Sequence, residues 1–215
     1  MTLVGGGSLD KSDLSRALSI GSYTVAADGG AEAAINHNVL PNAIIGDFDS
    51  ISDKYLSKIP SDAQHRIEEQ DSTDFDKCLR NIDSPLILAV GFTGARIDHQ
   101  LAAFNTLVRY PDKRCILLGP CDTVFLAPPA INLDLPASTT VSLFPMGAVE
   151  GHSEGLKWPI SGICFTPDGQ IGTSNEATGP VSLALTAPKM LVTVPSEHFE
   201  LVANALQNTA SHWPS

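Results

Sequence analysis

The chain has 215 residues, of which 43% are hydrophobic and 17% charged, enough apolar side chains for one large domain or two small ones. Its 24 acidic and 13 basic residues give a formal net charge of -11, which repels nucleic acid and anionic membrane surfaces. No apolar run reaches the roughly 18 residues that span a bilayer, and the four cysteines show neither a CxxC pair nor a zinc-ligand spacing. We therefore expect a cytoplasmic protein with reduced thiols and no nucleic-acid or membrane partner.

The first half of the chain, residues 1–121, alternates short apolar runs with helical patterns, as α/β domains with a mainly parallel sheet do. Strands are predicted at residues 2–4, 23–27, 43–45, 86–90 and 115–118. Each of these strands meets polar or glycine residues at its carboxyl end, which is the edge where open α/β sheets bind ligands.

Helices are predicted between these strands, at residues 10–18, 31–38 and 74–82 and in the segment that follows Gly94. Thr73 and Asp76 have the spacing of a capping box at the start of the third of these helices. The helix after Gly94 is expected to carry one apolar stripe, made of Ile97, Leu101, Phe104 and Val108.

The second half, residues 122–215, has short β-prone stretches broken by proline and glycine, which predict a small antiparallel sandwich or barrel. Strands are expected at residues 140–144, 162–165 and 191–194, with a turn at 166–169 after the second. A terminal helix is expected over residues 199–206.

The motif Gly46-Asp47-Phe48-Asp49-Ser50 directly follows the apolar run at residues 43–45. Residues two apart on a strand point the same way, so Asp47 and Asp49 are expected to present paired carboxylates at the sheet edge. Hard oxygen ligands of this kind suit Mg²⁺, which takes one or two carboxylates together with substrate phosphates. The alternative is an ordinary solvated turn.

A second acidic segment, residues 70–74, leads into the helix that carries Lys77. Asp74 and Lys77 lie three apart and are therefore neighbours on one helix face, where the carboxylate could complete a metal site and the ammonium could meet a phosphate. The alternative is that Asp71 and Asp74 only favour the helix N-terminus electrostatically.

A third cluster, residues 91–99, follows a predicted strand and opens a helix. Its glycines let backbone N–H groups approach an anion, and Arg96 adds a planar fork suited to phosphate oxygens. The spacing matches neither the dinucleotide fingerprint nor the Walker motif. His99 is expected to be a contact rather than a base, and Asp28, at the end of a strand, can be read as an ordinary turn or cap residue.

These motifs, taken in order, resemble those of the thiamine pyrophosphokinase family. The resemblance is carried by six segments that span nearly the whole chain: residues 27–31 (ADGGA), 45–50 (IGDFDS), 71–77 (DSTDFDK), 94–99 (GARIDH), 155–160 (GLKWPI) and 173–176 (TSNE). Ala95 departs from the pattern, because the family commonly has a second glycine before the arginine.

The resemblance implies an ATP-binding α/β domain over residues 1–121, a thiamine-binding all-β sandwich over residues 122–215, and a homodimer with active sites at the subunit interface. It implies Mg²⁺ bound by Asp47, Asp49 and Asp74. It implies ATP contacts from Asp28, Gly29, Lys77, Arg96, Asp98 and His99. It implies thiamine contacts from Gln70, Leu156, Trp158, Ser174 and Asn175.

The activity implied is transfer of the pyrophosphoryl group of ATP to the hydroxyl of thiamine, giving thiamine diphosphate and AMP. The residues expected to serve this in-line attack at the β-phosphorus are Asp47, Asp49, Asp74, Lys77 and Arg96, with Asp74 or Asp49 as a candidate proton acceptor. Trp158 can stack on a pyrimidine or a cationic thiazolium, although a core tryptophan is the alternative. The rival functions are a magnesium-dependent phosphohydrolase, a glycosyltransferase and a non-catalytic thiamine or nucleotide sensor.

Overall fold

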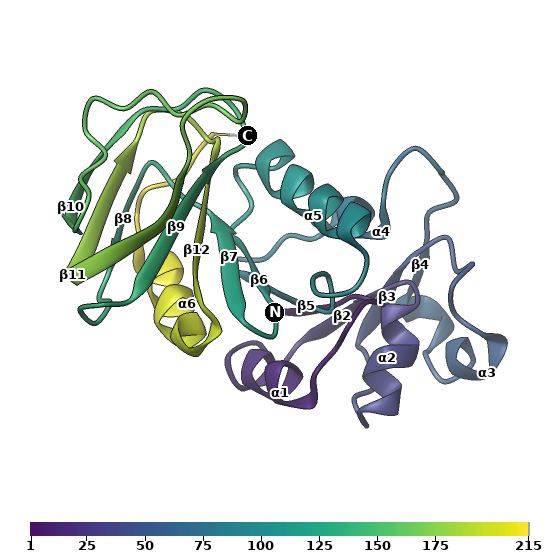
Figure 1. Cartoon of the computed structure of the whole chain (residues 1–215). Coiled ribbons are helices and arrows are strands. Elements are labelled where there is room, and N and C mark those ends of the chain that lie inside the picture. Colours follow the sequence, from purple (N-terminus) through teal and green to yellow (C-terminus); the bar gives the residue numbers. More distant parts are fainter. Residues whose placement is uncertain (215) are drawn as a thin grey trace. The chain divides into compact units, whose positions relative to one another are not determined.

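The structure is a computed structural model that describes residues 1–214, and it divides into two compact units (Figure 1). Unit 1 comprises Met1–Thr106 and Leu117–Pro120. Unit 2 comprises Leu107–Ile116 and the chain from Cys121 onward. The assignment of ATP binding to residues 1–121 and of thiamine binding to residues 122–215 stays a prediction.

Unit 1 is built on five parallel strands in the order β5-β1-β2-β3-β4. These strands are β1 (Thr2–Val4), β2 (Thr24–Ala27), β3 (Ala43–Gly46), β4 (Gln64–Arg66) and β5 (Ile87–Val90). All but β4 are buried along their whole length, as expected of parallel strands covered on both faces. The predicted strands are confirmed, including β6 (Cys115–Leu118). The polar edge strand β4 gave no apolar signal and was missed.

The helices of this part of the chain are α1 (Lys11–Ile20), α2 (Gly30–Asn36), α3 (Asp53–Leu56), α4 (Asp74–Asn81) and α5 (Ile97–Arg109), with a 3-10 turn at Ser61–Ala63. The predicted N-cap is confirmed, because Thr73 Oγ1 accepts a hydrogen bond from the backbone N–H of Asp76 at 3.3 Å. The cap fixes where α4 begins, and so it fixes Asp74 in the first turn.

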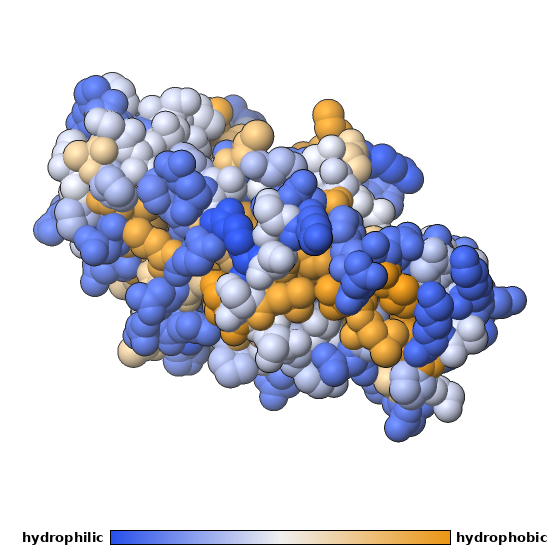
Figure 2. Space-filling model, turned by 90° about the horizontal axis from the view of Figure 1, so that it is seen from below, coloured by the Kyte–Doolittle hydropathy of each residue, from blue (hydrophilic) through white to orange (hydrophobic). Residues whose placement is uncertain are grey.

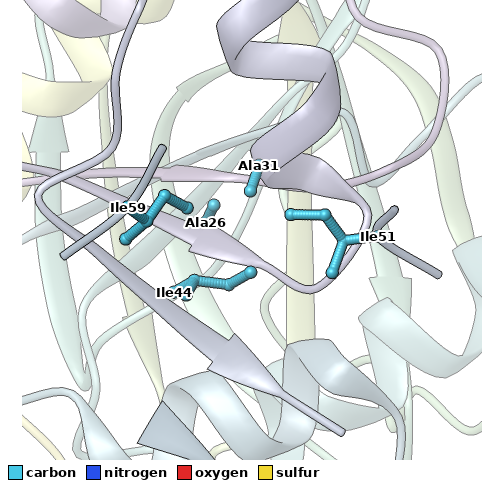
Figure 3. Close-up of a cluster of buried hydrophobic side chains, with 5 residues drawn as sticks. All are labelled: Ala26, Ala31, Ile44, Ile51 and Ile59. Atoms are coloured by element: carbon cyan, nitrogen blue, oxygen red, sulfur yellow. The ribbon is translucent and has the colours of Figure 1, made fainter. Parts of the chain in front are cut away.

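A buried apolar cluster holds α2 against the sheet and supports the chain that follows β3 (Figure 3). Its members come from β2, α2, β3 and the segment after β3, and they are Ala26, Ala31, Ile44, Ile51 and Ile59. The two alanines leave room for helix and sheet to approach closely, while the isoleucines fill the remaining volume. The loop that carries the DxD motif therefore starts and ends on packed residues.

The apolar stripe predicted for α5 is only partly correct. The helix forms and buries Val108, but Ile97 is 77% exposed and Leu101 is 58% exposed. The buried side of the helix instead carries Ala103 and Leu107, four residues apart, with Val108 beside them. The small Ala103 lets this side pack closely, which a count of large apolar residues does not reveal.

Unit 2 contains two antiparallel sheets that share one long strand. Its strands are β7 (Asp122–Leu126), β8 (Ala130–Leu133), β9 (Thr140–Pro145), β10 (Gly151–Leu156), β11 (Gly172–Leu185) and β12 (Met190–Pro195). The first half of β11 pairs with β9, which continues to β12 and β7, and its second half pairs with β8 and β10. Alternate residues of the second half are buried, namely Val181, Leu183 and Leu185.

Two expectations for unit 2 require correction. The unit is not all-β, because the helix α6 (Phe199–Asn208), which follows a 3-10 turn at Ser196–His198, packs against β8 and buries Phe199, Val202, Ala203 and Leu206. This outcome confirms the predicted terminal helix. The expected strand at 162–165 does not form, because Gly162 has a φ of 80° and only Phe165 makes isolated bridges, to Val149 and Gln170.

One face of the surface can be described by its hydropathy. The face in Figure 2 is mainly hydrophilic, with hydrophobic side chains gathered in separate patches. Among the helices of residues 1–214, none combines the length and the hydropathy required to cross a bilayer. The four cysteines are free thiols, and burial raises the pKa of both Cys78 and Cys115.

Candidate functional site

The carboxyl ends of β2 and β3 approach each other closely enough to bring two aspartates together. Asp28 directly follows β2 and Asp47 directly follows β3. Between them lies Gly46, and a Cβ atom at this position would come within 2.7 Å of the Asp28 Cβ. A glycine at the end of β3 therefore permits the contact, and Asp28 itself takes a left-handed backbone with a φ of 42°, which Asp and Asn tolerate best among residues with side chains.

Three carboxylates form a cluster at this sheet edge. One oxygen from each of Asp28, Asp47 and Asp74 lies within 4.8 Å of the others, and they are the group with metal-ligating spacing among residues 1–214. Asp28 and Asp47 come from strand ends and Asp74 comes from the first turn of α4. Sheet edge and helix start thus supply a compact set of hard oxygen atoms.

Lys77 neutralises part of this charge from within the protein. Its side chain is 2% exposed, and Nζ donates to Asp47 Oδ2 at 2.8 Å and to Asp74 Oδ1 at 3.1 Å. Burial by itself lowers the pKa of Lys77, but the hydrogen bonds to both carboxylates outweigh burial, and the pKa lies above its ordinary value. The same ammonium holds the pKa of Asp47 below its ordinary value.

The ionised form of Asp28 is disfavoured in this cluster. Its pKa is raised from 3.8 to about 6, chiefly by burial and in smaller part by the charges of Asp74 and Asp47. The backbone N–H of Ser50, which donates to Oδ2 at 3.1 Å, opposes this rise. Burial also raises the pKa of Asp74. Within residues 1–214, no group donates a hydrogen bond to the buried Asp28 Oδ1.

This donor set fits a hard divalent cation. Buried carboxylates that repel one another, one of them with an unpartnered oxygen, gain most from a positive charge placed among them. All the ligand atoms are oxygens, which Mg²⁺ prefers over the nitrogen and sulfur ligands that suit zinc.

The paired presentation of Asp47 and Asp49 expected from strand alternation is wrong. Strand β3 ends at Gly46, and Phe48 has a φ of 68°, so the alternation stops before Asp49. The chain turns instead, with the Asp49 N–H donating to Asp47 Oδ1 at 3.2 Å. Asp49 is exposed, and its side chain interacts with that of Asp28, so its assignment as a metal ligand stays a prediction. Asp28, which the sequence analysis assigned to ATP, lies in the cluster with Asp47 and Asp74. Its position after a neighbouring parallel strand is the signal that could have indicated this.

Gln70 lies against the cluster rather than apart from it. Its Nε2 donates to Asp47 Oδ2 at 3.0 Å, the oxygen that Lys77 also contacts. Arg66 adds a bond that sequence reasoning missed, from its Nε to the Asp47 backbone carbonyl at 3.1 Å. Asp47 is therefore held at Oδ2 of its carboxylate and at its backbone carbonyl.

The residues predicted to contact ATP divide into buried and exposed groups. Gly29 precedes α2 beside Asp28, whereas Arg96, Asp98 and His99 are exposed at the start of α5. Arg96 forms an ion pair with Asp98, and both side chains are about two-thirds exposed, at 67% and 64%. Thr93, which sequence reasoning did not single out, has a buried hydroxyl with no hydrogen-bond partner among residues 1–214.

In unit 2, Trp158 and Asn175 are brought together by reciprocal hydrogen bonds. The backbone N–H of Trp158 donates to Asn175 Oδ1 at 3.2 Å, and Asn175 Nδ2 donates to the backbone carbonyl of Trp158 at 2.7 Å. Trp158 is 55% exposed, so the core alternative for this tryptophan is wrong. Both residues line a pocket of about 170 Å³. Leu156 is buried and Ser174 is exposed, and neither lines that pocket.

Two irregularities of the β-structure flank this pair. The pairing of β10 with β11 shifts register between Glu154 and Leu156, around Gly155 with a φ of 75°. The pairing of β11 with β9 shifts between Gly172 and Asn175, where Ser174 has a φ of 60°. Bulges of this kind redirect side chains, and here they precede Trp158 and Asn175.

Comparison with known families accounts for these motifs together. Residues 14–118 match the profile described as thiamin pyrophosphokinase, catalytic domain, and residues 130–190 match the one described as thiamin pyrophosphokinase, vitamin B1 binding domain. The chain belongs to the thiamine pyrophosphokinase family. The acidic cluster lies within the first matched segment, and Trp158 and Asn175 lie within the second.

Individual thiamine pyrophosphokinases are similar to the chain in sequence and fold. Thiamine pyrophosphokinase 1 of Arabidopsis thaliana is 33% identical over 161 residues, 66% of this chain and 60% of that protein. The chain spans about 60% of the length of the curated relatives that it matches first. The Candida albicans structure has a TM-score of 0.73 at 18% identity, covering 90% of this chain and 88% of the other. The Bacillus subtilis structure has a TM-score of 0.71 at 21% identity, covering 91% and 99%.

Proposed function

We propose that this chain is a thiamine pyrophosphokinase that transfers the pyrophosphoryl group of ATP to the hydroxyl of thiamine, giving thiamine diphosphate and AMP. The observation that carries the proposal is the cluster of Asp28, Asp47 and Asp74 around the buried Lys77, at the sheet edge where α/β domains bind ligands. Membership of the family supports thiamine as the acceptor.

The acidic cluster would hold the divalent cation, for which Mg²⁺ is the proposed identity. The proposed ligands are Asp47, Asp49 and Asp74, and Asp28 is added to them because its carboxylate lies in the same cluster as those of Asp47 and Asp74. When bound, such a cation neutralises charge on the phosphate oxygens of ATP and thereby makes the phosphorus open to attack. Hydrogen bonds from the Ser50 N–H to Asp28, and from Lys77 and Gln70 to Asp47, orient these two carboxylates within the cluster.

Lys77 and Arg96 are the proposed cations for the phosphate chain. Lys77 is fixed by two carboxylates, so its ammonium is already oriented and costs little reorganisation when negative charge develops in the transition state. Arg96 is paired with Asp98 at the surface, where water screens their attraction, so its guanidinium can exchange this partner for a phosphate. Gly29, Asp98 and His99 complete the proposed nucleotide contacts.

Trp158 and Asn175 are proposed to bind thiamine, together with Gln70, Leu156 and Ser174. The Lys157 ammonium lies 5.0 Å from the centre of the Trp158 ring, so this exposed indole already attracts a cation. A cationic thiazolium offers the same interaction, and Asn175 fixes the backbone that carries the indole.

The reaction proposed is in-line attack of the thiamine hydroxyl on the β-phosphorus, with AMP leaving. Positioning of the two substrates supplies a large part of the rate. Asp49 is exposed and carries no ion pair with Lys77, which makes it a candidate to accept the hydroxyl proton. Asp74, whose pKa is raised by burial, is the other candidate. The homodimer and the cytoplasmic location expected from the sequence remain part of the proposal.

The test is an assay of the full chain with thiamine, ATP and Mg²⁺ in which AMP and thiamine diphosphate are measured together. Equal amounts of both products are expected. The Asp47→Asn variant is expected to lose activity by a factor on the order of 10² or more. ADP or free phosphate without a thiamine ester would indicate a phosphohydrolase, and binding without turnover would indicate a sensor.

A further inference from the structure

Residues 67–73 form the loop that connects β4 to α4 (Figure 1). The carboxylate of Glu69 in this loop has two hydrogen-bond partners. Glu69 Oε1 accepts hydrogen bonds from the hydroxyl of Ser72, in the same loop, and from the guanidinium of Arg80, on α4. These two bonds, Ser72 first, lower the pKa of Glu69, which is therefore ionised at neutral pH. The loop is thus tied both to itself and to the helix that carries Asp74 and Lys77.

The residue next to Glu69 reaches the acidic cluster. Gln70 Nε2 lies 3.0 Å from Asp47 Oδ2, and that oxygen also accepts from Lys77 at 2.8 Å. The side chains of these two consecutive residues therefore have different partners, because Glu69 accepts from Arg80 on α4 and Gln70 donates to Asp47. An unpaired loop of seven residues has many conformations, so a bond at Glu69 restricts where the Gln70 amide can lie.

We propose that Glu69, held by Arg80 and Ser72, is a positioning residue that places the Gln70 amide at Asp47 for the reaction. This inference rests on the proposed function, in which Gln70 contacts thiamine and Asp47 helps to hold the cation. Glu69 itself touches neither the cluster nor the substrates. It acts through the residue that follows it.

Kinetics of Glu69→Ala provide the first test, with Glu68→Ala as the matched control. Glu68 is the preceding residue, is 78% exposed and forms one ion pair among residues 1–214, with Arg66 Nε at 3.5 Å. Arg66 Nε donates directly to the Asp47 carbonyl at the shorter distance of 3.1 Å, so Glu68→Ala should leave that bond in place. Glu69→Ala is expected to raise the KM for thiamine about five-fold while the KM for ATP stays unchanged, because an exposed ion pair fixes the loop only modestly. Glu68→Ala should leave both constants unchanged.

A double-mutant cycle separates the clamp from a general structural role. If Glu69 and Arg80 act as a unit, the Glu69→Ala/Arg80→Ala double variant should raise the thiamine KM no more than the stronger single variant does. Additive effects, or an equal rise in the KM for ATP, would overturn the proposal.

The position of Gln70 can also be observed without any turnover. In the ¹⁵N NMR spectrum, the Gln70 side-chain amide signals are assigned by their absence in Gln70→Ala. They should move toward the values of free glutamine in Glu69→Ala and stay in place in Glu68→Ala. An inactive wild-type protein with this shift would reject the proposed function and keep the clamp. An active protein in which neither the signals nor the thiamine KM change would overturn the clamp.

Discussion

At the scale of single residues, the acidic cluster makes the metal-free protein sensitive to pH. Asp28 has a pKa of about 6 in the folded chain against 3.8 ordinarily, so the folded state binds its proton more tightly than the unfolded state does. Stability that depends on this group is therefore greatest below pH 4 and is lost as the pH rises through 6. An ionised Asp28 destabilises the native state at neutral pH unless a cation compensates it.

The variant Asp28→Asn tests this relation, because asparagine tolerates the left-handed backbone and keeps an oxygen for the Ser50 N–H. With EDTA at pH 8, its free energy of unfolding in urea should exceed that of the wild type by about 1 to 3 kcal/mol, and the difference should shrink toward pH 4. Saturating Mg²⁺ should then stabilise the wild type more than the variant. A variant that is less stable at every pH, with or without Mg²⁺, would contradict this explanation.

The exposed indole of Trp158 leads to a second prediction at this scale. Trp158→Ala should raise the KM for thiamine about ten-fold, the value expected for loss of a cation–π contact of roughly 1.4 kcal/mol, and should leave the KM for ATP unchanged. The control is Ile171→Ala, which removes another exposed apolar side chain from the same pocket without removing an indole. Equal effects of both substitutions would show that Trp158 acts only as apolar surface.

The sequence predicted the individual residues at the sheet edge better than it predicted which of them lie together. The sequence identified Asp47, Asp74 and Lys77, because strand ends and helix starts place side chains reliably at the sheet edge. It assigned Asp28 to ATP and did not predict that its carboxylate lies beside those of Asp47 and Asp74. It also extended strand alternation to Asp49, because the left-handed backbone at Phe48 is not revealed by any local pattern. The reciprocal bonds between Trp158 and Asn175 join residues 17 apart and could not be predicted from spacing.

At the scale of secondary structure, the bulge in β10 lies directly before the segment that carries Trp158. Gly155 has a φ of 75°, and a Cβ atom there would lie 2.0 Å from the Pro180 carbonyl oxygen. Gly162 has a nearly equal φ of 80°, but a Cβ atom there meets nothing within 4 Å. The two glycines therefore share a left-handed backbone, which only glycine adopts at no steric cost, and they differ in the space available for a Cβ atom.

Alanine at each position separates the two effects. Gly162→Ala should lower the free energy of unfolding by about 1 to 2 kcal/mol, the cost of a left-handed alanine. Gly155→Ala should lower it by more, because β11 must also move away, and it should raise the KM for thiamine. Equal losses of stability in urea titrations would mean that the close approach at Pro180 is readily relieved.

Apolar patterns predicted most helices and strands, and they failed where tertiary packing determines which side chains are buried. Buried strands such as β3 and β5 are continuous apolar runs, which leave little ambiguity. Strand β4 is polar because it lies at a sheet edge, and α5 buries Ala103 in preference to Ile97. Both failures arise because burial depends on neighbours that are distant in sequence.

At the scale of the whole molecule, the predicted assembly is a homodimer. The resemblance to the family is the basis of this prediction. Sedimentation equilibrium should give a mass twice the 22.7 kDa of the chain. A mass of 22.7 kDa at concentrations where the enzyme turns over would reject the homodimer and leave the transfer reaction open.

The fate of the phosphates of ATP tests the central proposal most directly. With thiamine and Mg²⁺ present, ³²P at the γ-position of ATP should appear in thiamine diphosphate, and ³²P at the α-position should appear only in AMP. Pyrophosphoryl transfer requires both results, because the β- and γ-phosphates move together and the α-phosphate leaves. Release of the γ-label as inorganic phosphate, with no label in a thiamine ester, would contradict the proposed function.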